Sequence, residues 1–108
     1  MCRMNQKKGL IMIDFEWDLA KAQTNLRKHR VAFSEAASVL RGGLSITIYD
    51  PDHSDEEDRH ITIGPSVSGR FLMVAHADRS DRIRIISDRE LTRKEREAYE
   101  NEIQKRKV

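Results

Sequence analysis

Cysteine, proline and long apolar segments are all scarce in this 108-residue sequence. The one cysteine, Cys2, excludes an internal disulfide and is typical of proteins from a reducing compartment. The longest apolar runs, Leu10–Ile13 and Phe71–Ala75, are far too short to cross a bilayer, and the first is also too short for a signal peptide. We therefore expect a cytoplasmic protein that does not associate with a membrane.

The content of hydrophobic residues is also low, at 38%, whereas charged residues make up 35%. A chain of this length forms one domain with one modest core. The net charge is only +2, but residues 50–58 hold six acids, and residues 79–107 hold ten Lys or Arg against seven acids. The basic C-terminal third permits an anionic partner, although a surface covered with ion pairs explains the same composition.

The sequence lacks the motifs of metal and triphosphate chemistry. Its four histidines do not have the spacing of zinc ligands. The acidic segment that begins at Asp50 is not a calcium loop, because Asp55 stands where the loop needs glycine and Ile61 where it needs the closing glutamate. A glycine-rich phosphate loop and a nucleophile elbow are also missing. We expect no metal and no cofactor.

The N-terminal part divides into an irregular segment and a helical one. Residues 1–11 show no periodicity, so they are either a flexible arm or an extension ahead of a translation start at Met12, with a single domain over residues 12–108. Alternating apolar residues at 11, 13 and 15 predict a short strand. Asp18 is expected to cap a helix over Leu19–Lys28, and Ser34 a second one over Glu35–Leu40 that ends at Gly42 and Gly43.

The rest of the chain indicates a sheet followed by a helix. Apolar and β-branched residues alternate over residues 44–48, 59–64, 70–77 and 82–87, and short turns separate the last three segments. Thr92 and Glu95 form a capping box that opens a helix to about Lys105. These elements predict an α+β fold: an antiparallel meander with two N-terminal helices and one C-terminal helix.

The remaining histidine, glutamate and arginine residues suit RNA cleavage without a metal. RNA carries its own nucleophile, the 2′-hydroxyl, so a protein needs a base, an acid and cations around the phosphate. His53 and Glu57 lie four residues apart and can meet if their segment turns. In strand 82–87 the alternation places Arg82, Arg84 and Ile86 on one face and Ile83, Ile85 and Ser87 on the other.

Each of these residues also has a purely structural interpretation. His53 can be a solvated loop residue, and His76 can bind a backbone carbonyl. The stems of Arg82 and Arg84 can cover apolar surface. Lys28 and His29 can complement the dipole at a helix end. From these residues alone the sequence indicates a small α+β domain with an anion site.

Several blocks of the sequence resemble the BrnT family of ribonuclease toxins from toxin–antitoxin systems. The opening block consists of Phe15-Glu16-Trp17-Asp18, Lys21, Asn25, Lys28-His29, Val31, Phe33 and Ala36. The central block consists of Asp52-His53-Ser54, Glu57, Arg59, Ile63-Gly64, Gly69-Arg70, Val74, His76 and Arg79. The closing block consists of Arg84-Ile85-Ile86-Ser87, Arg89, Glu95 and Tyr99. The blocks occur in order from about Asp14 to Glu100.

This resemblance implies a RelE-like fold and a sequence-tolerant endoribonuclease that blocks translation. It also implies neutralisation by a cognate ribbon–helix–helix antitoxin, which binds operator DNA for the complex, with a toxin dimer within that complex. In this interpretation His53 and Glu57 form the acid–base pair, and cleavage leaves a 2′,3′-cyclic phosphate. Arg59, Arg79 and Arg84 hold the phosphate, and Lys28, His29, His76, Arg82 and Arg89 bind RNA. The alternative is a non-catalytic subunit that binds a partner protein or operator DNA.

The sequence departs from the family pattern at two positions. Asp88 separates Ser87 from Arg89 where the family has a small residue, and we expect its carboxylate to pair with Arg89 and weaken that arginine's hold on phosphate. Arg30 follows Lys28-His29 where the family often has glycine. If that position is left-handed, arginine there costs roughly 1–2 kcal/mol.

Overall fold

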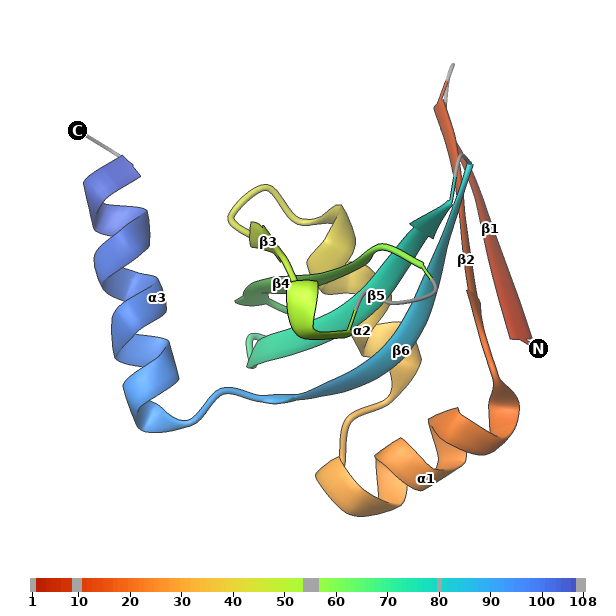
Figure 1. Cartoon of the computed structure of the whole chain (residues 1–108), viewed down its shortest axis with the longest axis horizontal. Helices are drawn as coiled ribbons and strands as arrows, with labels where there is room; N and C mark the ends of the chain where they lie inside the picture. Colours follow the sequence, from red (N-terminus) through yellow and green to blue (C-terminus); the bar gives the residue numbers. More distant parts are fainter. Residues whose placement is uncertain (1, 9–10, 54–56, 80, 107–108) are drawn as a thin grey trace.

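The computed structural model describes residues 2–8, 11–53, 57–79 and 81–106; for residues 2–8, 11–13 and 53 it describes the backbone only. Six strands form one sheet in the order β1-β2-β6-β5-β4-β3 (Figure 1). The strands are β1 (Cys2–Lys8), β2 (Ile11–Trp17), β3 (Ile46–Tyr49), β4 (Arg59–Pro65), β5 (Phe71–Arg79) and β6 (Arg82–Glu90). The helices are α1 (Leu19–His29), α2 (Phe33–Arg41), α3 (Arg93–Arg106) and a short 3-10 helix at Pro51–His53.

The pairing of β3, β4, β5 and β6 is antiparallel throughout, which confirms the predicted meander and the α+β class. Two pairings were not predicted. Strand β2 joins β6 in parallel, through Asp14–Glu16 and Arg82–Arg84. Strand β1 pairs with β2 within the segment that was expected to be an arm. The β2–β6 pairing joins distant segments, which local periodicity does not report, and the polar sequence of β1 lacks the apolar alternation that marks a strand.

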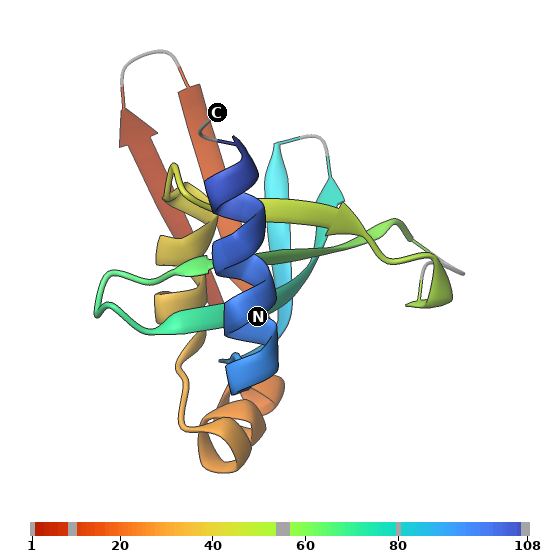
Figure 2. The ribbon, with the colours of Figure 1, turned by 90° about the vertical axis from the view of Figure 1, so that its left-hand side faces the viewer.

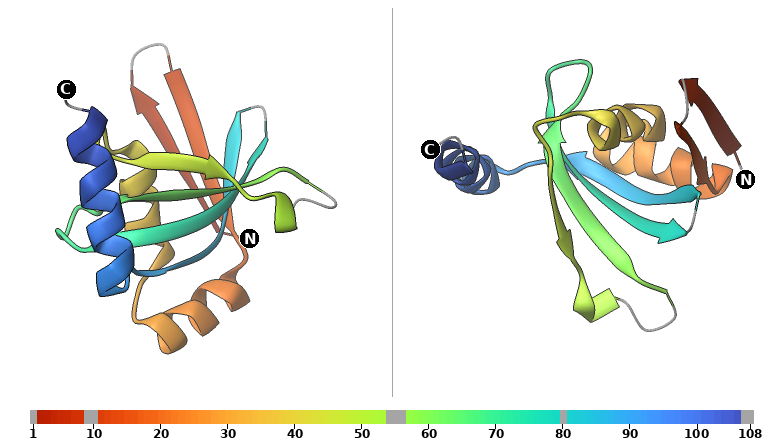
Figure 3. Two further views of the ribbon diagram at one scale, coloured as in Figure 1. Left: turned by 60° about the vertical axis from the view of Figure 1, so that its left-hand side comes forward. Right: turned by 90° about the horizontal axis from the view of Figure 1, so that it is seen from above.

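Helices α1 and α2 cover one face of the sheet, and α3 lies on the other side (Figure 3). The core between α1, α2 and the sheet is made of Phe15, Trp17, Val31, Phe33, Ala36, Ala37, Val39, Leu72, Val74 and Ile85. In the described part of the chain no helix is long and apolar enough to span a membrane. The hydrophobic core therefore lies on the face that α1 and α2 cover, and the opposite face is left as the place to look for a functional site.

The predicted start of α1 is confirmed, whereas that of α2 is wrong. Asp18 accepts hydrogen bonds from the backbone N–H groups of Ala20 and Lys21, at 2.8 and 3.1 Å. Helix α2 begins at Phe33 with Ala32 as its N-cap and without a side-chain cap, so Ser34 lies inside the helix. The earlier start places Phe33 on the same buried helix face as the apolar residues one turn later, and this burial outweighs the missing cap.

In the turn after α1, Arg30 is left-handed, with a φ angle of 60°. Its N–H bonds the Leu26 carbonyl at 2.9 Å, and its own carbonyl accepts from Arg70 Nη1 at 3.1 Å. Arg70 also donates to Glu35, which accepts from Ser66 and Ser68 as well. This network fixes the turn to α2 and to the β4–β5 loop, so tertiary contacts offset the local cost of a non-glycine residue.

Helix α3 lies beside one end of the sheet (Figure 2). Its capping box is confirmed: Thr92 N–H donates to Glu95 Oε1 at 2.8 Å, and Glu95 N–H donates to Thr92 Oγ1 at 3.2 Å. Tyr99 is the one buried residue of α3, and its hydroxyl donates to the Leu44 carbonyl. The Tyr99 ring lies 5.7 Å from that of Phe71. The helix therefore borders the uncovered face without filling it.

Candidate functional site

The sheet face opposite α1 and α2, here called the open face, is defined by alternate residues of β5: Met73, Ala75, Ala77 and Arg79. Their partners on β6 are Arg89, Ser87, Arg84 and Arg82, in that order. On β4, Ala77 is paired with Arg59 and Ala75 with Ile61. Directly paired residues share a face, so the open face carries arginines at the end near the β5–β6 turn and apolar side chains further along.

A β-bulge in β6 determines which residues reach this face. The pairing skips Ile86, because Ala75 pairs with Ser87 while the next residue, His76, pairs with Ile85. An extra residue in one strand reverses the alternation beyond it. The prediction that Ser87 shares a face with Ile83 and Ile85 is therefore wrong. Ser87 lies with Arg84 on the open face.

Asp88 and Arg89 are neighbours in the regular part of β6 beyond the bulge, so their side chains point to opposite faces. Asp88 turns to the covered face, is 1% exposed, and has Oδ1 bonded by Asn25 Nδ2. Arg89 turns to the open face and donates to both carboxylate oxygens of Glu95, at 2.8 and 2.9 Å. The predicted Asp88–Arg89 ion pair is thus wrong, and Arg89 instead joins α3 to the sheet. Burial raises the pKa of Asp88 to about 7, although the bond from Asn25 opposes this rise.

The end of the open face near the β5–β6 turn carries a group of charged residues, Glu57, Arg59, Arg79 and Arg84, here called the Glu57 cluster. Arg79 Nη2 donates to Glu57 Oε2 at 2.7 Å, and Arg84 Nη1 lies 3.5 Å from Oε1. The hydrogen bond from Arg79 and the charges of Arg84 and Arg59 hold the pKa of Glu57 below its usual value, despite some desolvation. The carboxylate is therefore ionised at neutral pH and lies between two guanidinium groups.

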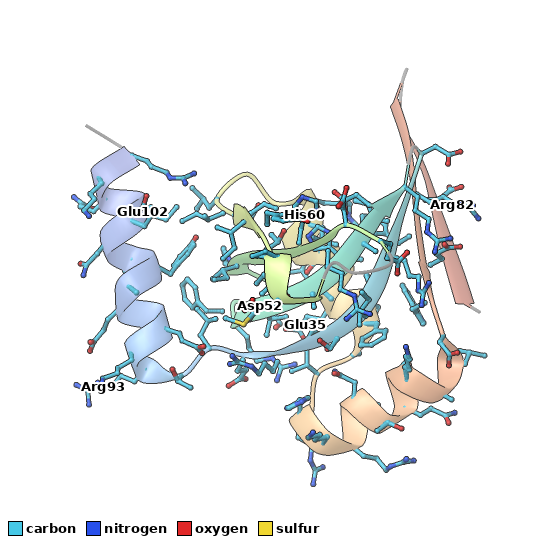
Figure 4. All side chains as sticks on the ribbon, viewed as in Figure 1. Glu35, Asp52, His60, Arg82, Arg93 and Glu102 are labelled. Atoms are coloured by element: carbon cyan, nitrogen blue, oxygen red, sulfur yellow. The ribbon has the colours of Figure 1, made fainter. Side chains whose placement is uncertain are left out.

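Strand β2 brings a second carboxylate beside the cluster. Glu16 is paired with Arg84, and its own carboxylate lies 3.4 Å from Arg82 Nη1. Glu16 is 5% exposed, whereas Arg82 remains partly exposed at the β2–β6 end of the sheet (Figure 4). A buried acid in a strand costs free energy unless it is paired. The position of Arg82 is thus determined by Glu16, a residue that the sequence analysis did not single out for the site.

His53 closes the 3-10 helix in the same β3–β4 connection that carries Glu57. Its side chain lies outside what the structure describes, so its role as the acid stays a prediction. Among the described residues no group of three or more His, Cys, Asp or Glu could hold a metal ion.

His76 lies on the covered face, away from the Glu57 cluster. It is 2% exposed, with Nε2 2.7 Å from Thr62 Oγ1 and Nδ1 2.6 Å from Asp78 Oδ1. Its ring stacks on that of His60, which Figure 4 labels near the centre of the sheet. Burial lowers the pKa of His76 against the opposing effect of Asp78. Both ring nitrogens are occupied, so this histidine supports the sheet rather than presenting a surface to a ligand.

Lys28 and His29 lie at the end of α1, which packs along β6 on the covered side. They line a pocket of about 350 Å³ together with Ala20, Lys21, Thr24, Asn25, Ile86 and Ser87. The structure therefore brings Glu57, Arg59, Arg79 and Arg84 together and places Arg82 beside them. Lys28 and His29 lie apart from this cluster, in the pocket beside α1. Asn25, which lines this pocket, was given no role from the sequence. Its side chain donates to the carbonyls of Val31 and Asp88. A polar residue on the core-facing side of a helix was the signal that could have identified it.

The chain is similar to a known protein family and to a solved structure. The model of the ribonuclease toxin BrnT of type II toxin–antitoxin systems matches residues 17–95. The chain is also similar to the crystal structure of the Brucella abortus ribonuclease toxin BrnT, with a TM-score of 0.53 and 22% sequence identity, over 71% of this chain and 94% of the other. At that identity the structural likeness shows the fold alone. A comparison with curated protein sequences gives no match.

Proposed function

Because the chain belongs to the family of BrnT ribonuclease toxins of type II toxin–antitoxin systems, we propose that the Glu57 cluster is its active site and cleaves RNA without a metal ion. The observation that carries this proposal is the position of the Glu57 carboxylate between Arg79 and Arg84 on an uncovered sheet face. A carboxylate can accept a proton, and guanidinium groups bind two phosphate oxygens at once. The two groups are adjacent here, as cleavage by the 2′-hydroxyl requires.

In the proposed reaction Glu57 takes the proton of the 2′-hydroxyl, whose oxygen attacks the neighbouring phosphorus. The bond from phosphorus to the 5′-oxygen breaks, and His53 gives that oxygen a proton. The products are a 2′,3′-cyclic phosphate and a 5′-hydroxyl. Arg59, Arg79 and Arg84 stabilise the charge that develops on the phosphate oxygens. The base and the acid each contribute about 10²–10⁴-fold to the rate.

The ion pairs of the free protein also suggest how substrate prepares the base. Without RNA, Arg79 and Arg84 both contact Glu57 and lower its pKa, which makes it a weak base. A phosphate bound between these arginines competes with Glu57 for their hydrogen bonds and places a second negative charge beside the carboxylate. Both changes raise the pKa of Glu57 toward its ordinary value. Glu57 thus becomes a stronger base when the phosphate is bound.

Membership of a type II toxin–antitoxin family implies an antitoxin partner. We propose that this antitoxin is a ribbon–helix–helix protein and that it contacts operator DNA on behalf of a complex holding two toxin copies. RNA cleavage that blocks translation would take place in the cytoplasm. These statements are supported by the family membership, whereas the catalytic proposal is supported by the cluster itself.

Digestion of single-stranded RNA by the purified protein in excess EDTA tests the proposed function. We expect cleavage to persist in the chelator and to leave 2′,3′-cyclic phosphate ends, because every group in the proposed reaction is a side chain or the RNA itself. Mass spectrometry of the fragments identifies the ends. Loss of activity in EDTA with recovery in magnesium contradicts the metal-free mechanism. Intact RNA under all conditions supports a non-catalytic binding subunit instead.

A further inference from the structure

The pocket beside α1 is a second concave surface with its own chemistry. One wall is the face of α1 that carries Lys21, Thr24 and Lys28, and the other is β6 at Ile86 and Ser87. Asn25 holds the two walls together, because its side chain bonds both the N–H and the carbonyl of Asp88. The pocket is therefore held open by a buried hydrogen-bonded contact rather than by exposed side chains.

The cations of this pocket differ in their partners from the arginines of the open face. Arg79, Arg82, Arg84 and Arg89 each lie within 4.0 Å of a carboxylate. Lys21 and Lys28 form no ion pair with any residue that the structure describes. Asp18 lies close enough to Lys21 to feel its charge, but its carboxylate is bound to the first turn of α1. Lys21 and Lys28 lie about 10 Å apart along one helix face, and the hydroxyl groups of Thr24 and Ser87 line the same pocket, so the pocket carries groups that attract an anion.

Strand β6 connects this pocket with the Glu57 cluster. Ser87 lines the pocket and also lies on the open face, two positions beyond Arg84 in the row of paired residues once the bulge is counted. The separation along the strand is about 7 Å. Strand β2 pairs with β6 only as far as Arg84, so from Ile85 onward no strand within the described ranges covers this edge of β6 (Figure 1). A flexible chain of phosphates can therefore pass from the cluster over Ser87 to the lysines.

We propose that the pocket of Lys21, Lys28 and Ser87 binds a phosphate of the same RNA strand, a few nucleotides from the scissile bond. This inference rests on the proposed function of the Glu57 cluster. Continuity with the open face through Ser87 favours RNA over an acidic peptide, which would need no such connection. Lysine contacts to phosphate carry no sequence information. The pocket thus increases the affinity for long RNA of any sequence and leaves the chemistry to the cluster.

The test compares the double variant Lys21→Gln/Lys28→Gln with a control of equal charge change on α3, Lys94→Gln/Lys105→Gln. Binding is measured by fluorescence anisotropy at several salt concentrations, with a 2′-O-methyl RNA of about ten nucleotides. This probe has no free 2′-hydroxyl, so the result does not depend on catalysis. Each lost phosphate contact reduces the slope of log affinity against log salt by about 0.7. We expect the pocket variant, which loses one bound phosphate, to lose about 0.7 from that slope and the control to lose none.

A second measurement separates this inference from the proposed function. The ratio of kcat/KM for a long RNA to kcat/KM for a dinucleotide is expected to fall in the pocket variant, because only the long RNA reaches the lysines. An unchanged salt slope, or an unchanged ratio in a protein that cleaves both substrates, overturns the phosphate site and leaves the active site standing. If the variant binds RNA like the wild type but escapes neutralisation by the antitoxin, the phosphate site is also overturned, and the pocket belongs to an acidic segment of that partner.

Discussion

Replacement of Glu57 by glutamine is expected to lower the rate of RNA cleavage by about 10²–10⁴-fold while tightening the binding of RNA. Glutamine has the same shape but accepts no proton at neutral pH, so the base is lost. At the same time Arg79 and Arg84 lose the carboxylate that now lies 2.7 and 3.5 Å away. Their charge becomes available to phosphate. Single-turnover cleavage and anisotropy with 2′-O-methyl RNA measure the two effects separately.

The opposite signs distinguish catalysis from a structural role. The contacts of Glu57 are partly exposed, and such ion pairs contribute at most about 1 kcal/mol to stability. The urea midpoint of Glu57→Gln should therefore be close to that of the wild type. His53→Gln provides the matched control for the acid: its rate should fall similarly, with no gain in RNA binding. A Glu57→Gln protein that cleaves at the wild-type rate contradicts the assignment of the base.

Replacement of Asp88 by asparagine is expected to stabilise the protein at pH 8 by up to roughly 4 kcal/mol and to change little at pH 4. The pKa of Asp88 rises from 3.8 to about 7 on folding, chiefly because of burial. The unfolded chain therefore releases this proton at lower pH than the folded protein does. The free energy of unfolding of the wild type therefore falls by about 1.4 kcal/mol per pH unit as the pH rises from 4 toward 7. Asparagine resembles the neutral acid and cannot ionise.

Urea unfolding of wild type and Asp88→Asn at several pH values between 4 and 8 measures this effect. The difference between the two proteins isolates Asp88, because Glu35 and Glu95, whose pKa values fall to about 2 through their arginine partners, are present in both. Those two carboxylates act in the opposite direction, since their stabilisation is lost as the pH falls from 4.5 toward 2. Parallel pH profiles for the two proteins contradict a buried, neutral Asp88.

The parts of the fold that were predictable from the sequence depend on neighbours in the chain. Asp18 bonds N–H groups two and three residues away, and Thr92 and Glu95 bond each other. The alternation of β4 and β5 likewise follows from burial on one side of the sheet. The parallel β2–β6 pairing was not predictable, because nothing within β2 indicates that β6 lies beside it. Strand β1 was not predictable, because its polar sequence lacks the apolar alternation that marks a strand.

The bulge at Ile86 is the clearest example of a site feature that the sequence did not predict. The residues Ile85-Ile86-Ser87-Asp88 continue a strand pattern without any glycine or proline to mark an irregularity. The bulge allows both Ile85 and Asp88, three residues apart, to face the covered side, where Asp88 is bonded to Asn25. Period-two alternation therefore gave the correct face for Arg84 and the wrong one for Ser87.

The Glu57 cluster itself could be anticipated in part. A meander places Arg59, Arg79 and Arg84 on neighbouring strands, and the family resemblance singled out the same residues. The resemblance also grouped His76 with them, although this histidine faces the other side of the sheet. Asp78, two residues later and thus on the same face as His76, was the available signal, because a carboxylate beside a strand histidine often fixes its ring.

An RNA with a single 2′-deoxy nucleotide at a site that the protein cuts tests whether the 2′-hydroxyl is the nucleophile. We expect cleavage to disappear at that one bond, while the other sites of the same molecule are cut at their usual rate in excess EDTA. The nucleophile in the proposed reaction is the hydroxyl removed from that nucleotide, and no other step changes. Continued cleavage at the deoxy position would contradict the account, because the attacking group would then have to be water.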